Sequence, residues 1–429
     1  MTHNQSGDLI RSANLLPQED LIFSEGDRLV LKQLAGEVAQ LAARPQEQAK
    51  RRSWSDLNRL KPARPVIFCF PENAWSEILP ADKLVCSGKI ARQWEFQLRQ
   101  EIYWGKTLQD DRVIEPIFPL EHVKTRFAHW GLEEEILGGD EGGAYSWEPM
   151  LKSEADLNRL HYPTQEVDFE ATQALLDTAN ETFGDLLPVR IRDWWWGVKG
   201  LTDTIIGLRG MEQLMYDLVD RPDFVRRLMA LLRDGTLAFE DELVRKELLQ
   251  LNNKGSYVGS GGFGWTDELP ALEFKGQVRL SDRWGFGESQ ETVGISPRMF
   301  GKLIFPYQLP IMERYGLTCY GCCEPLEKRW KYISQIPNLR RVSVPPWSDR
   351  GEMAEFLGDQ YVFSMKPNPA DLAGEHFDEE KIRTDLRRDL EITHGCCVEV
   401  IMKDTHTVCN QPQRLGRWVQ IVREEVERL

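Results

Sequence analysis

The residues best suited to binding a metal gather in two short segments of the sequence. One segment contains Cys322, Cys323 and Glu324, and a second, near the C-terminus, contains His406. Each follows a run of apolar residues typical of a β-strand, and α/β proteins place their active sites at the carboxyl ends of strands. Cysteine, histidine and glutamate together suit a tetrahedral Zn²⁺ ion with an open position, whereas thiolates disfavour Mg²⁺ and Ca²⁺. We therefore predict a catalytic zinc site made of Cys322, Glu324 and His406, with Cys323 as the alternative thiolate.

Simple burial is the competing explanation for these residues. Free cysteine behaves as a small hydrophobic side chain, and a loop histidine can be held by hydrogen bonds alone. Cys396 and Cys397 stand at the amino end of their predicted strand, away from the expected site. We interpret that second pair as buried structural residues.

Carboxylates and aromatic residues occupy comparable positions near the predicted strands. We predict Glu288 and Asp193 as catalytic residues, because a carboxylate at a strand end can act as an acid or a base. Glu288 could equally satisfy backbone N–H groups at the start of a helix. Aromatic side chains suit a pocket for a flat or apolar ligand, and three are predicted to bind substrate: Trp195, Trp284 and Tyr320.

A glycine-rich segment, residues 259–264, matches the G-x-G-x-x-G pattern of dinucleotide-binding proteins. That pattern is informative when it joins a strand to the start of a helix. Here a long predicted helix precedes it, and the residues that follow have no helical character. We predict a loop that lines a pocket, and no NAD site.

The elements that must position these residues alternate between short apolar strands and helices. Such alternation implies parallel strands joined by helical crossovers. The predicted strands are residues 66–70, 188–193, 277–282, 317–320, 341–345, 361–365 and 397–402. The predicted helices are residues 27–43, 169–183, 223–249, 325–336 and 377–393.

Seven strands are compatible with either a closed barrel or an open doubly wound sheet. An eighth strand could lie at 256–258 or at 204–208. We predict an α/β fold, a (β/α)₈ TIM barrel over residues 61–429. An N-terminal helical extension would cover residues 1–60, and a β-rich insertion about residues 111–147.

Composition excludes several classes of protein. The 429 residues carry 53 basic and 68 acidic side chains, a net charge of −15, which argues against a nucleic-acid partner. No apolar stretch is long enough to span a membrane, and the N-terminus lacks a secretory signal pattern. We expect a cytoplasmic protein with reduced cysteines. A homodimer stays open at this stage.

Four segments resemble the uroporphyrinogen decarboxylase superfamily, in particular its cobalamin-dependent methyltransferase branch. These segments are residues 51–58 (RRSWSDLN), 287–291 (GESQE), 320–325 (YGCCEP) and 403–407 (KDTHT). The resemblance implies a (β/α)₈ barrel in which zinc activates the group that gains or loses a methyl. It also implies a separate corrinoid protein that carries the cobalt.

The sequence departs from the coenzyme M methyltransferases of this branch. Their H-x-C-G motif aligns with Thr318-Cys319-Tyr320-Gly321, and a later cysteine ligand falls near His406. Because the thiol-activating ligand set is not reproduced, a thiol substrate is not expected. A zinc site with a carboxylate ligand favours an oxygen donor.

We therefore predict a zinc-dependent methyltransferase that acts as the substrate component of an O-demethylase system. It would move a methyl group from a methoxylated, aromatic substrate to the Co(I) corrinoid of a partner protein. The alternatives are a decarboxylase-like lyase, with a pocket lined by Arg190, Arg192 and Arg283, and a non-catalytic barrel that binds a tetrapyrrole or corrinoid.

Overall fold

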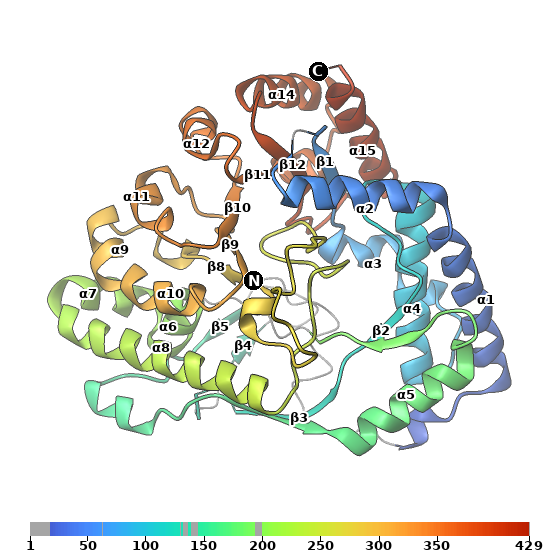
Figure 1. Cartoon of the computed structure of the whole chain (residues 1–429), viewed down its shortest axis with the longest axis horizontal. Coiled ribbons are helices and arrows are strands. Elements are labelled where there is room, and N and C mark those ends of the chain that lie inside the picture. The colour runs from blue at the N-terminus through green and yellow to red at the C-terminus, as the bar shows by residue number, and fades with distance from the viewer. Residues whose placement is uncertain are drawn as a thin grey trace.

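The computed structural model describes residues 18–61, 63–128, 130–131, 136–138, 145–193 and 200–428. These parts form a mixed α/β fold in which helices surround a parallel sheet of six strands, in the order β1-β12-β11-β10-β9-β8 (Figure 1). The strands of this sheet are Val66–Cys69 (β1), Trp284–Gly287 (β8), Leu317–Tyr320 (β9), Leu339–Val344 (β10), Val362–Met365 (β11) and Cys397–Met402 (β12). Most of their residues are buried, as expected for a parallel sheet covered on both faces.

A separate parallel pair joins Phe118–Leu120 (β2) to Val189–Ile191 (β7). With the six strands of the main sheet it gives eight parallel strands, the number found in a (β/α)₈ barrel. The described strands do not pair into a closed ring, so the closed barrel stays a prediction. Neither predicted position of the eighth strand is a strand. Residues 256–258 contribute only an isolated bridge from Tyr257 to Phe263, and residues 204–208 lie in helix Thr202–Arg209 (α6).

Two antiparallel pairs occupy the β-rich insertion predicted at about residues 111–147 and extend beyond it, because one of their strands lies at residues 164–168. Val123–Ala128 (β3) pairs with Thr164–Asp168 (β6), and Ile136–Gly138 (β4) pairs with Tyr145–Trp147 (β5).

One predicted strand, residues 277–282, is wrong. The Asp282 carboxylate accepts hydrogen bonds from the backbone and the side chain of Arg279, which bends the chain into a short 3₁₀ turn. The strand β8 begins only after this turn.

Helices account for most of the remaining chain. Besides α6 they are Glu25–Ala42 (α1), Pro45–Asn58 (α2), Trp75–Ile78 (α3), Lys89–Tyr103 (α4), Phe169–Phe183 (α5), Met211–Asp220 (α7), Pro222–Arg245 (α8), Pro297–Leu303 (α9), Phe305–Met312 (α10), Trp330–Ile333 (α11), Arg350–Leu357 (α12), Ala370–Ala373 (α13), Glu379–Ile392 (α14) and Gln413–Val426 (α15). The predicted apolar stripe of α1, which includes Leu31 and Val38, is buried where α1 contacts α4 and α5. In the described part of the chain, no helix is long and apolar enough to cross a bilayer.

The glycine-rich segment 259–264 enters the interior beside the strands, and its yellow-green trace runs through the middle of the view (Figure 1). A Cβ on Gly259 would lie 2.7 Å from the Cβ of Cys319 on β9, and one on Gly262 would lie 2.8 Å from Glu399 Oε2 on β12. Both glycines also have positive φ angles, so the loop needs glycine for conformation as well as for space. Ser260, in this loop, reaches the end of β9, where its hydroxyl lies 3.3 Å from Cys322 Sγ.

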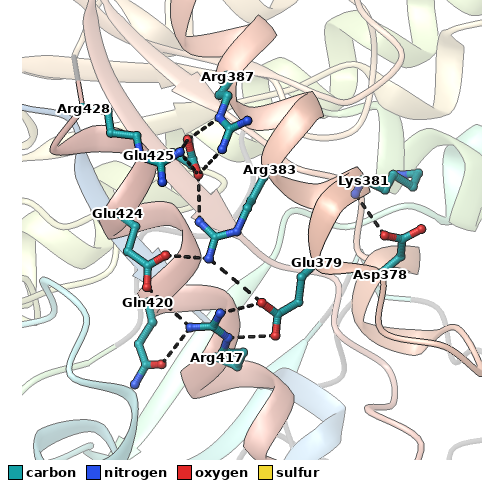
Figure 2. Close-up of polar contacts among 10 residues, drawn as sticks. All are labelled: Asp378, Glu379, Lys381, Arg383, Arg387, Arg417, Gln420, Glu424, Glu425 and Arg428. Atoms are coloured by element: carbon teal, nitrogen blue, oxygen red, sulfur yellow. Dashed lines mark hydrogen bonds and ion pairs between the residues drawn. The ribbon is translucent and has the colours of Figure 1, made fainter.

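A network of ion pairs joins α14 to α15 (Figure 2). Its centre is Glu425, whose fully buried side chain accepts hydrogen bonds from Arg383, Arg387 and Arg428. The hydrogen bond from Arg387, which outweighs the opposing effect of burial, and those from the other guanidinium groups hold the pKa of Glu425 below its ordinary value. The network fixes the last helix against the one that precedes β12.

Replacing Glu425 with glutamine is expected to lower the free energy of unfolding by about 1–2 kcal/mol at neutral pH. This is the lower range for a charged hydrogen-bond network, because Arg387 and Arg428 are about half exposed. A carboxylate with a depressed folded pKa stabilises the protein above its ordinary pKa and loses that effect as pH falls through the folded value. The difference between the two proteins should therefore disappear in acid. Urea unfolding at several pH values measures it, with Glu424→Gln as the control because Glu424 is about half exposed.

Candidate functional site

The loops that follow six neighbouring strands meet at the carboxyl end of the main sheet. The residues that these loops contribute are Glu72 after β1, Glu288 and Glu291 after β8, Cys322, Cys323 and Glu324 after β9, Trp347 after β10, Lys366 after β11, and Lys403 and Asp404 after β12. Ser260 joins them from the glycine-rich loop. This is the edge at which parallel α/β folds place their active sites.

The loop that carries the two cysteines is held by hydrogen bonds between its backbone and nearby side chains. Gly321 adopts a φ of +91°, and a Cβ there would lie 2.6 Å from Leu326, so the sharp exit from β9 requires glycine. The backbone N–H of Cys322 donates to Glu324 (2.8 Å), and its carbonyl accepts from Ser343 (2.8 Å). The carbonyl of Cys323 accepts from the Trp347 indole N–H at 2.7 Å. Both thiols are therefore fixed in position by β9 and β10.

The two thiols form an unequal pair. Their sulfur atoms lie 3.7 Å apart, and Cys322 Sγ also lies 3.3 Å from Ser260 Oγ and 3.8 Å from Lys403 Nζ. The hydrogen bond from Cys323, with the nearby Lys403 ammonium and the Ser260 hydroxyl, lowers the pKa of Cys322 to about 6 against the opposing effect of burial. The pKa of Cys323 is raised because its thiol donates to Cys322. Near neutral pH the pair holds a thiolate on Cys322 and a proton on Cys323.

Glu72 supplies a carboxyl group that can hold a proton near neutral pH. Burial raises its pKa to about 7, and the charges of Asp404 and Cys322 act in the same direction, while Lys403 opposes them. Its Oε2 atom is covered from solvent and has no hydrogen-bond partner among the described residues. A covered carboxyl oxygen without a hydrogen-bond partner is rare in folded proteins and marks Glu72 as a candidate functional group.

Two further carboxylates, Glu288 after β8 and Glu324 after β9, are almost fully buried. Burial raises the pKa of Glu324 to about 7, with the charge of Cys322 adding to the effect. Burial, and then the charge of Glu291, also raises the pKa of Glu288 well above its ordinary value. Glu324 accepts from the backbone N–H of Ser289 at 2.7 Å, and Glu288 accepts from that of Gln290 at 2.7 Å. Both groups therefore brace the loops after β8 and β9.

An open pocket of about 590 Å³ lies between the loops after β8, β9 and β10, and we call it the mouth pocket. Its lining residues are Gln290, Glu291, Val293, Cys323, Glu324, Pro325 and Trp347. The volume falls within the range of small-molecule sites. One of the two thiols of the pair thus borders a space large enough for a small substrate.

The predicted zinc ligands do not come together. His406 is exposed and its ring hydrogen-bonds with Asn73 at 2.9 Å, while Glu324 is engaged with the backbone N–H groups of Ser289 and Cys322. Within the described ranges, no group of three or more His, Cys, Asp or Glu side chains is arranged to hold a metal ion. The set Cys322, Glu324 and His406 therefore does not fit a zinc ion.

The other predicted site residues have varied surroundings. Asp193 is buried and accepts from the backbone N–H of His122 at 2.9 Å; burial would raise its pKa, but the His122 hydrogen bond and the Lys124 charge hold it below its ordinary value. Trp284 and Tyr320 are fully buried, and each donates its polar hydrogen inside the protein, to Gly264 and Gln308. Neither lines the mouth pocket. Their substrate-binding role stays a prediction, as does that of Trp195, which lies outside the described residues.

Five residues of the site were not predicted: Glu72, Ser260, Trp347, Lys366 and Lys403. Lys403 directly follows β12 and Glu72 follows β1 by a short turn, so the position of a strand end was the available signal for both. Trp347 carried a weaker signal, an aromatic residue after β10. Ser260 carried none, because its loop reaches the site from the interior.

Comparisons with known proteins show the fold and nothing finer. No protein-family model matches the chain, and no curated protein matches it by sequence. Among solved structures, the chain is similar to a methyltransferase from Methanosarcina mazei, with a TM-score of 0.50 and 11% sequence identity. The match covers 87% of this chain and 98% of that chain. The likeness thus extends over almost the whole of the solved protein.

Proposed function

We propose that the protein is a methyltransferase that takes a methyl group from a methoxylated, aromatic small molecule and transfers it to the Co(I) corrinoid of a separate partner protein. The observation that carries the proposal is the constellation of Cys322, Lys403 and Glu72 at the carboxyl ends of three strands. It is linked to the mouth pocket through Cys323, which contacts Cys322 and lines the pocket. The similarity in fold to a methyltransferase is consistent with it.

Glu72 is the proton donor in this proposal. Breaking the bond between a methyl carbon and an ether oxygen leaves the electron pair on oxygen, which must then be neutralised. The corrinoid of the partner would supply the nucleophile that receives the methyl group. Glu72, with a pKa of about 7, delivers its proton to the departing oxygen, and solvent restores it.

Burial is the main cause of the raised pKa of Glu72, and neighbouring charges adjust it. The Lys403 ammonium lowers this pKa, and the charges of Asp404 and Cys322 raise it further. Burial lowers the pKa of Lys403, but the negative groups around it, Cys322 and Asp404 among them, outweigh burial and keep the lysine charged. Burial and these charges together hold Glu72 near the midpoint of its titration at neutral pH.

Zinc dependence remains a prediction, and no step above uses zinc. Elemental analysis of the purified protein and of a Cys322→Ser/Cys323→Ser variant tests it: about one zinc per chain, lost in the variant, would support the prediction.

The lyase alternative has no support from the arginines on which it rests. Arg283 is buried, Arg192 pairs with Glu115 at 2.7 Å, and Arg190 is exposed. None of the three lines the mouth pocket.

Mixing the protein with Co(I) cobalamin and 2-methoxyphenol tests the proposed function. We expect catechol to form with an equivalent loss of Co(I) absorbance, because the methyl group leaves the oxygen for cobalt. Catechol is quantified by chromatography, and boiled protein is the blank. Cobalamin that binds without turnover of this or other methoxyarenes would contradict the proposal and favour a non-catalytic corrinoid-binding protein.

A further inference from the structure

Trp347 is a large exposed apolar residue held in one orientation at the mouth pocket. Its side chain is 61% exposed, although the residue lies in the loop directly after β10. Its single polar group, the indole N–H, donates to the carbonyl of Cys323 at 2.7 Å. An indole fixed by its edge in this way offers its faces to a ligand at little cost in conformational entropy.

The rest of the apolar lining comes from the loops on either side. Val293, after β8, is 53% exposed, and Pro325 follows the cysteine loop. Together with the Trp347 indole, these side chains bound a space that directly adjoins Cys323. An apolar ring that filled this space would lie beside the thiol pair.

The polar part of the lining is acidic. Glu291 accepts from Thr202 at 2.8 Å and from Gln290 at 3.0 Å, and Glu324 accepts from two backbone N–H groups. The pocket lining includes no arginine or lysine. A ligand carboxylate placed here would meet two acidic groups and no lining cation, which is unfavourable.

We propose that the mouth pocket binds the aromatic ring of a neutral methoxyarene, and that Trp347 is the residue that selects it by stacking. This inference rests on the proposed function and names its substrate class: uncharged methoxyarenes in preference to methoxybenzoates. The ring packs between Trp347 and Val293, and Glu291 rejects the carboxylated analogue.

Calorimetric titration of the full chain, without any corrinoid, tests the preference. The probes are 2-methoxyphenol, which is neutral, and 3-methoxybenzoate, which is an anion. We expect 2-methoxyphenol to bind at least about tenfold more tightly, a ratio equivalent to one favourable contact. Equal affinity, or a preference for the benzoate, would overturn the proposal.

Substitutions test whether Trp347 and Glu291 cause the preference for the neutral ligand. Trp347→Ala should weaken 2-methoxyphenol binding about tenfold, Trp347→Phe should retain most of it, and Leu272→Ala, a change at a fully exposed apolar residue elsewhere, should leave it unchanged. Glu291→Gln should improve binding of the benzoate about fivefold. An unaltered affinity in Trp347→Ala, with circular dichroism showing a folded protein, would refute the role of Trp347.

The two proposals can fail separately. Selective binding that depends on Trp347, without methyl transfer to Co(I) cobalamin, would refute the proposed function and leave this site in place. Methyl transfer that is unaffected by Trp347→Ala would refute this site and leave the function in place.

Discussion

Replacing Glu72 with glutamine is expected to reduce the rate of methyl release by about 10²–10⁴-fold, the usual contribution of a positioned proton donor. Glutamine preserves the shape of the side chain and cannot donate a proton to a departing oxygen with comparable acidity. The comparison uses kcat for catechol formation from 2-methoxyphenol. Asp82→Asn, a change at an exposed acidic residue of the same region, is the matched control and should keep the wild-type rate.

The pH dependence gives this prediction a sign. Glu72 acts in its protonated form, so the wild-type rate should fall tenfold per pH unit above the pKa of about 7. The residual rate of Glu72→Gln should not show this decline with pH. Because the Cys322 thiolate raises the pKa of Glu72, the decline should begin at lower pH in Cys322→Ser.

A stability measurement checks the same group without turnover. Burial raises the Glu72 pKa from 4.5 to about 7, so ionising it in the folded protein costs about 3 kcal/mol. The wild-type protein should lose that amount as pH rises from 4.5 through 7, whereas Glu72→Gln should not. Parallel stability curves for the two proteins, or a full rate in the variant, would show that Glu72 is not the proton donor.

The helices and strands that short sequence patterns define were predicted correctly. Helix α5 and strands β9 and β12 have the predicted bounds. For the two strands, the pattern was a continuous apolar run between turn residues, which indicates a buried strand. Strand β2 was missed because it is three residues long and contains Pro119, which removes a hydrogen-bond donor. Whether β2 and β7 join the main sheet depends on pairing across long sequence distances, which local patterns do not encode.

The candidate site was predictable to the extent that it follows from strand ends. That rule placed Cys322, Cys323 and Glu324 at the correct edge of the sheet. It could not show that Glu324 would turn inward to brace backbone N–H groups, or that His406 would face solvent beside Asn73. Side-chain direction after a strand depends on the φ angles of one or two residues, here Gly321 at +91° and Asp404 at +58°.

A second large effect is expected inside the sheet, where Arg341 on β10 and Glu399 on β12 form a buried ion pair. Their side chains are 2% and 0% exposed, with Arg341 Nε 3.0 Å from Glu399 Oε1. Arg341 also donates to Asn58 of α2 at 2.7 Å, so the pair ties the N-terminal helices to the sheet. Burial lowers the pKa of Arg341, but the charge of Glu399 outweighs it and keeps the guanidinium charged.

Glu399→Gln should therefore lower the free energy of unfolding by about 3–5 kcal/mol, the cost of leaving a buried charge uncompensated. Lys366 increases the effect, since burial already lowers its pKa to about 8 and Glu399 is the main negative group that opposes this, ahead of Cys322. The joint variant Arg341→Met/Glu399→Leu should recover much of the loss, because it removes both charges at similar volume. Urea unfolding measures all three proteins.

The control for this prediction is an exposed ion pair. Lys32 and Asp185 lie 3.1 Å apart with side chains that are 53% and 63% exposed, and Asp185→Asn should change stability by less than about 0.5 kcal/mol. A loss below about 1 kcal/mol in Glu399→Gln would mean that water reaches the pair and screens it. A joint variant less stable than the single one would instead show that the pair stabilises the fold beyond its own desolvation cost.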